Sequence, residues 1–144
     1  MRHGIIFPIA VCFMLGTAIA AEPVAQKDAP SFIAHNSTHA FQRTTDGGIQ
    51  QIVAKDPNDK ALVSAIRTYL ETEAVRFGNG DYLDHSKAHG KAMPGTLYLK
   101  AIKPSQIAIT YRDVPGGAAV DYAGRDTAAV DAIHKWFDAA TPSP

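Results

Sequence analysis

Cysteine is almost absent from this 144-residue chain, because the one residue of this kind, Cys12, lies near the amino terminus. The rest of the chain therefore offers neither disulfides nor thiolate metal ligands. An excess of one charge is also lacking, since 14 basic residues balance 14 acidic ones. Without a basic excess, the sequence gives no indication of a nucleic-acid partner. No apolar run reaches the roughly 20 residues of a membrane-spanning helix, so we expect no transmembrane segment in the mature chain.

The amino-terminal segment has the features of an export signal. Arg2 provides a positive charge, residues 5–16 are largely apolar, and an A-x-A cleavage motif ends at Ala20. We therefore expect residues 1–20 to be removed as a signal peptide and the protein to be periplasmic or secreted. Residues 21–36 contain two prolines and show no hydrophobic period, so we expect a flexible lead-in there.

The remaining residues, 37–144, predict a single domain with two similar halves. In each half a glycine-containing turn joins two β-prone segments, at Asp46-Gly47 in the first half and at Pro115-Gly116 in the second. A helical segment follows each pair of strands, and segment 59–70 aligns with segment 126–137. The sequence thus predicts an α+β fold. Two ββα repeats form one antiparallel four-stranded sheet with both main helices on one face.

The second turn also predicts the register of its two strands. A turn at Pro115-Gly116 pairs Ile109 with Tyr122 and Tyr111 with Val120, which gathers the large apolar side chains on one face. The other face receives small and polar residues, so we expect the sheet to be covered on one side only.

Helical periodicity is strongest in residues 56–78 and 126–140. Asp56 and Asp126 are suitable N-caps for these two helices. Glu73 falls within the apolar face of the first helix. It is either buried with a partner, because an unpaired buried charge is very costly, or exposed by fraying of the last turn.

Histidine spacing gives the only metal signal in the sequence. His85, His89 and Met93 follow one another at intervals of four residues, and imidazole with thioether is a soft ligand set. The competing interpretation is a polar surface loop in which these residues are incidental.

The chain also resembles a family of small exported bacterial proteins of unestablished function. The pieces that carry the resemblance run through most of the mature chain: His39-Ala-Phe41, Asp46-Gly-Gly48, Glu73-Ala-Val-Arg-Phe77, His89-Gly-Lys-Ala-Met-Pro-Gly95 and His134-Lys-Trp-Phe137. Some members bear the label aspartate carbamoyltransferase, but that enzyme is much longer and its S-T-R-T phosphate motif is absent here. Within the pieces lie five candidate site residues: His39, Glu73, His89, Met93 and His134. His35 and His85 lie outside them.

We therefore expect a metal site in which His39, His89 and Met93 converge. His134 or Glu73 is expected as a fourth ligand or as a neighbour of the ligands, and His35 and His85 are additional candidates. Histidine and methionine without a thiol favour copper, and zinc held by histidine with Glu73 is the alternative metal.

Two functions are compatible with these residues. The first is a periplasmic metal-binding protein that carries or buffers copper. The second is a module without metal that binds a small ligand or a protein partner of unknown identity. Catalysis is less favoured, because H-E-x-x-H, C-x-x-C-H, G-x-x-x-x-G-K-[ST] and G-x-S-x-G motifs are all missing.

Overall fold

The computed structural model of the protein describes residues 29–82 and 95–141. The expected signal peptide, residues 1–20, lies outside the described residues. In chain order the elements are α1 (Ala29–Asn36), β1 (Ser37–Thr44), β2 (Gly47–Ala54), α2 (Lys60–Gly78), α4 (Thr96–Lys100), the 3-10 turn η1 (Pro104–Gln106), β3 (Ile107–Val114), β4 (Gly117–Gly124) and α5 (Thr127–Ala140).

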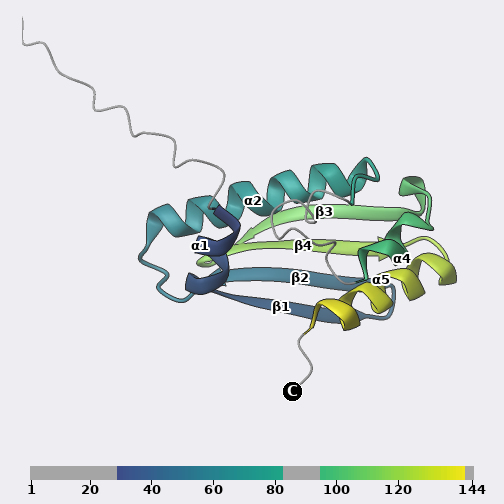
Figure 1. Ribbon diagram of the computed structural model, residues 1–144, viewed down its shortest axis with the longest axis horizontal. Helices are drawn as coiled ribbons and strands as arrows, with labels where there is room; N and C mark the ends of the chain where they lie inside the picture. Colours follow the sequence, from purple (N-terminus) through teal and green to yellow (C-terminus); the bar gives the residue numbers. More distant parts are fainter. Residues whose placement is uncertain (1–28, 83–94, 142–144) are drawn as a thin grey trace, which may run out of the picture.

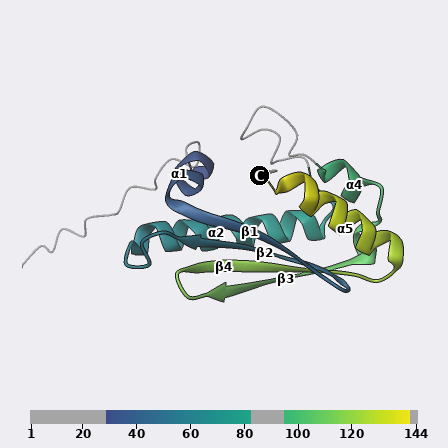
Figure 2. The ribbon, with the colours of Figure 1, turned by 90° about the horizontal axis from the view of Figure 1, so that it is seen from below.

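The strands form one antiparallel sheet in the order β1-β2-β4-β3, so each hairpin contributes one central strand and one edge strand. The helices lie on one face of this sheet (Figures 1 and 2). α2 packs mainly on β3 and β4, and α5 packs on β1, β2 and β4. The predicted α+β fold, with two ββα units and both main helices on one face, is confirmed.

The register of the second hairpin is the predicted one, since Ile109 pairs with Tyr122 and Tyr111 with Val120. In the first hairpin, for which the sequence predicted no register, Thr44 pairs with Gly47, so the two turn residues are 45 and 46.

Local capping explains where α2 begins. Asp59, rather than the expected Asp56, is its N-cap, and the Asp59 carboxylate accepts a hydrogen bond of 2.9 Å from the Leu62 N–H. The Asp56 carboxylate instead accepts from the Asn58 N–H and so stabilises the preceding turn. α5 begins as predicted, because Asp126 accepts from the Ala129 N–H at 2.8 Å.

The structure differs from the expected lead-in at residues 29–36, which form α1. Ile33 is 1% exposed and belongs to the core, and the Ser37 hydroxyl donates to its carbonyl at 2.5 Å. Tertiary burial of this one large side chain supports a helix that the weak local periodicity did not indicate.

The core lies between the sheet and the helices and is richest in aromatic rings where α5 meets the sheet. The Trp136 ring centroid lies 5.0 Å from that of Tyr122 and 5.5 Å from that of Phe77. Phe137 approaches the backbone of β2 so closely that a Cβ at Gly48 would lie 2.2 Å from its ring. The opposite face carries the expected small and polar residues, among them an ion pair in which Arg112 Nε lies 2.7 Å from an Asp121 carboxylate oxygen.

Candidate functional site

A group of polar side chains lies inside the core on the helix-covered side of the sheet. Gln50 on β2, Glu73 on α2 and Tyr122 on β4 are each less than 5% exposed, and so is Tyr82, which follows α2. We call these four residues the central polar cluster. The Tyr122 hydroxyl donates to Gln50 Oε1 at 2.8 Å, and both residues form hydrogen bonds with the Glu73 carboxyl group. Three elements from both repeats therefore meet at one buried polar point.

Burial dominates the electrostatics of Glu73. Loss of hydration raises its pKa to about 8, although the hydrogen bonds from Gln50 and Tyr122 favour the charged form. At neutral pH the carboxyl group is therefore mostly protonated and can donate one hydrogen bond as well as accept others. Of the two alternatives that the sequence left open for Glu73, burial is the correct one. The free-energy cost of burying its carboxyl group is reduced by protonation and by hydrogen bonds.

Tyr82 extends the cluster toward the end of α2. Its ring packs edge-on against Phe77, with the centroids 5.1 Å apart. Burial raises the pKa of Tyr82, and among the described residues its buried hydroxyl has no hydrogen-bond partner. An unsatisfied buried hydroxyl costs about 1–3 kcal/mol.

The central polar cluster contains a carboxyl group that keeps its proton at neutral pH. A carboxyl group with a pKa near 8 has the tuning of a general acid, and perturbed groups of this kind are common in active sites. Glu73 is only 4% exposed, however, so a substrate has no direct access to it. Buried polar networks of this type also fix the arrangement of a core, and that role requires no ligand.

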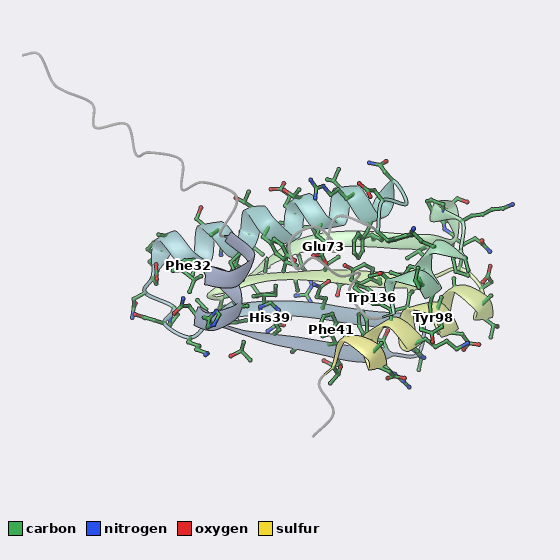
Figure 3. The ribbon with its side chains drawn as sticks, in the orientation of Figure 1. Phe32, His39, Phe41, Glu73, Tyr98 and Trp136 are labelled. Carbon is green, nitrogen blue, oxygen red and sulfur yellow. The ribbon has the colours of Figure 1, made fainter. Side chains whose placement is uncertain are left out.

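His39 is a predicted ligand whose residue is exposed. It lies on β1 between Ser37 and Phe41, opposite Ile52, and its side chain points to the helix-covered face (Figure 3). Burial of part of the ring lowers the pKa of His39, so the imidazole is neutral at pH 7. Within residues 29–82 and 95–141, no hydrogen bond or ion pair involves this ring. The exposed part of the ring is therefore accessible to a ligand.

His134 lies at the other end of β1. Its Nε2 atom is 3.0 Å from the carbonyl oxygen of Thr44, which is five residues from His39 along the strand. At about 3.3 Å per residue these two backbone positions are roughly 17 Å apart, too far for both imidazoles to bind one ion. His35, on α1, is exposed and its carbonyl accepts a hydrogen bond from Lys55.

The other predicted ligands, His85, His89 and Met93, lie outside the described residues. Within the described part of the chain, no group of three or more His, Cys, Asp or Glu side chains could hold a metal ion. The structure thus brings Glu73 into the core, leaves His39 accessible and separates His134 from it. Convergence of His39 with His89 and Met93 stays a prediction.

A surface groove that the sequence reasoning missed runs between α4 and α5, which lie side by side in Figure 1. Its volume is about 290 Å³, and Ala101, Ala128 and Ala132 contribute small side chains to its lining. Leu97 and Tyr98 border it while 67% and 48% exposed. Helical spacing could have indicated this, since Thr96 and Leu99 are buried and the two residues between them must face elsewhere.

Comparison with known protein families, with curated proteins and with solved structures finds no match to this chain. Among the helices of the described residues, none is both long enough and apolar enough to cross a membrane.

Proposed function

We propose that this protein, after export, binds copper through His39, His89 and Met93 and carries or buffers the ion. The observation that carries the proposal is the state of His39. Its ring is partly exposed, and within the described part of the chain it takes part in no hydrogen bond or ion pair. An imidazole held on a rigid strand without a competing partner is a suitable first ligand.

Two residues of the initial ligand set are left out of the proposed site. His134 Nε2 is already placed against the Thr44 carbonyl oxygen at the far end of β1. Glu73 is buried among neutral polar groups and mostly protonated at neutral pH, and a protonated carboxyl is a poor ligand. The proposed ligands are two imidazoles and one thioether, a set that suits copper in an oxidising compartment.

The test is a titration of the exported protein with Cu(I) and with Cu(II) under anaerobic and aerobic conditions, respectively. We expect His39→Ala and the double variant His89→Ala/Met93→Leu each to weaken copper binding by tenfold or more. His134→Ala is the matched control and should bind copper like the wild type. Equal uptake by all four proteins, or uptake by none, rejects the site.

A single Met93→Leu variant distinguishes copper from zinc. Zinc prefers nitrogen and oxygen donors when thiolates are absent, so replacing the thioether should matter little to a zinc site. Zinc binding that is unchanged in a Met93→Leu variant, together with weak copper binding, would assign the site to zinc.

The groove between α4 and α5 favours a second function, docking of a protein partner. Leu97 and Tyr98 form an apolar border, and Asp131 and Lys135 place opposite charges one helical turn apart on α5. An amphipathic helix with an apolar anchor and flanking charges matches this arrangement.

A leucine-rich amphipathic model peptide is a suitable probe, with binding followed by amide chemical-shift changes in 15N-labelled protein. We expect shifts confined to α4 and α5, and their loss in Leu97→Ser. The matched control is Val75→Ser, which removes a similarly exposed apolar residue from α2. Shifts that are equal in both variants would exclude docking at this groove.

A further inference from the structure

The two edges of the sheet differ in how well they are protected against pairing with another strand. Both edge strands, β1 and β3, are regular over eight residues and each pairs with one neighbour along its whole length. Natural edge strands usually avoid pairing by means of charges, prolines, bulges or covering elements. Strands β1 and β3 differ in how many of these protective features they have.

The β3 edge carries charged groups near the end of the strand. Asp113 lies on this strand, and Arg67 of α2 forms an ion pair with it at 3.3 Å. Arg67 also donates to the carbonyl oxygen of Val114 at the end of the strand, and the Tyr111 hydroxyl donates to the Asp113 carboxylate. A strand arriving at this edge would have to displace or desolvate these charges.

Among the described residues, the β1 edge has almost none of these features. Its sequence is STHAFQRT, in which Arg43, near the strand end, is the only formally charged residue. Arg43 forms an ion pair with Asp138 of α5. The strand has neither proline nor bulge, and most of its residues are exposed. Partly exposed aromatic side chains, Phe32 on α1 and Phe41 on β1, lie beside it (Figure 3).

The backbone pattern shows which groups this edge offers. The Lys55 N–H donates to the Asn36 carbonyl, which places the even-numbered residues of β1 in hydrogen-bonded pairs with β2. The odd-numbered residues therefore direct their N–H and C=O groups outward. These residues are Ser37, His39, Phe41 and Arg43.

We propose that β1 pairs antiparallel with β1 of a second copy of this chain, joining two sheets across a two-fold axis at Ala40. This register is the one that uses all four outward residues, since Ser37 meets the partner's Arg43 and His39 meets the partner's Phe41. No like charges face each other, because the two copies of Arg43 lie at opposite ends of the interface. Cross-strand pairing of two aromatic rings, His39 with Phe41, adds a favourable contact.

The helices add area to the strand pairing. α1 precedes the start of β1 and the end of α5 lies near its other half, where Asp138 meets Arg43 (Figure 1). A two-fold axis at Ala40 therefore brings α1 of one copy beside α5 of the other and covers Phe32, which is 46% exposed. Stable dimers bury about 1,200 Å² or more in total, so these helix contacts are needed beyond the strand edges.

A disulfide trap tests the register directly. At the two-fold axis Ala40 meets its own copy in a non-hydrogen-bonded pair, with Cα atoms about 4.5 Å apart, which suits a disulfide. In chains that also carry Cys12→Ser, we expect Ala40→Cys to give a covalent dimer on mild oxidation. The matched control is Ala108→Cys, which replaces another exposed alanine on the same sheet face but on the β3 edge. Failure of Ala40→Cys to crosslink, or equal crosslinking at Ala108→Cys, overturns the proposal.

Charge variants provide a second test that leaves the fold intact, because Thr38 and Gln42 are exposed on the uncovered face. In the proposed register Thr38 meets the partner's Gln42. Thr38→Lys with Gln42→Lys should convert the dimer to a monomer in sedimentation velocity, whereas Thr38→Lys with Gln42→Glu should keep it dimeric. Circular dichroism checks that both variants fold. A wild-type protein that sediments as a monomer, or identical behaviour of the two variants, contradicts this interface.

Discussion

Glu73→Gln should make the protein more stable at alkaline pH and should change how its stability depends on pH. The folded protein holds the Glu73 carboxyl at a pKa of about 8, whereas its ordinary value is 4.5. Between these values the unfolded chain has lost the proton that the folded chain still binds. The free energy of unfolding therefore falls as pH rises through this window. Glu73 has no effect on it below the window, and the loss is complete above pH 8.

The size of the effect follows from the shift. Each pKa unit corresponds to about 1.4 kcal/mol, so the full window amounts to about 5 kcal/mol, and the part between pH 5 and pH 8 to about 4 kcal/mol. Glutamine keeps the shape of the protonated carboxyl and a hydrogen-bond donor for its neighbours but does not ionise. The difference in unfolding free energy between Glu73→Gln and the wild type should therefore grow by about this amount from pH 5 to pH 8.

Urea denaturation at a series of pH values measures this difference, with tryptophan fluorescence from Trp136 as the probe. His39 has the opposite effect, since its lowered pKa costs stability as pH falls, but it is present in both proteins and cancels. Glu71→Gln is the matched control, because Glu71 is exposed on the same helix. A difference that stays constant from pH 5 to pH 8 would mean that Glu73 is ionised in the folded protein, and a protonated carboxyl in the central polar cluster would be excluded.

Two further changes test the packing and the capping. Gly48→Ala should destabilise the protein by about 1–3 kcal/mol in urea denaturation, because the added Cβ would lie 2.2 Å from the Phe137 ring. In the control, Gly78→Ala, the added Cβ would have nothing within 4 Å, so this change should be neutral or stabilising. Asp59→Ala should lower the melting temperature by removing the cap bond to Leu62, at a cost of about 1 kcal/mol, and Asp59→Asn should retain most of the wild-type stability.

The fold was predictable because its signals are local and mutually consistent. Alternation in the second hairpin fixed both the register and the buried face, since Ile109 and Tyr111 can reach the core only on one side. Asp126 identified the start of α5 because a carboxylate directly before a helical periodic segment is well placed to act as an N-cap. The helix at residues 29–36 was missed because its stability comes from burying Ile33 against distant segments, which leaves no periodic trace.

The candidate site was less predictable, because its geometry depends on long-range placement. The sequence identified Glu73 as anomalous within an apolar face, but Gln50 and Tyr122 became its neighbours only when β2 and β4 paired. His134 was a candidate ligand because it lies within one of the pieces that carry the family resemblance. The fold instead places its ring against the Thr44 carbonyl, a contact between residues 90 positions apart.

The proposed copper site and the proposed dimer share one residue, and this sharing makes them interdependent. His39 is the one proposed copper ligand that lies within the described residues, and in the proposed dimer it lies opposite the partner's Phe41. By linkage, any factor by which dimerisation changes copper affinity must equal the factor by which copper changes dimer affinity. The oxidised Ala40→Cys dimer and the monomeric Thr38→Lys/Gln42→Lys variant provide both states for one copper titration. Unequal affinities would show that the partner strand reaches the imidazole, whereas equal affinities would show that metal binding and strand pairing use separate sides of the same residue.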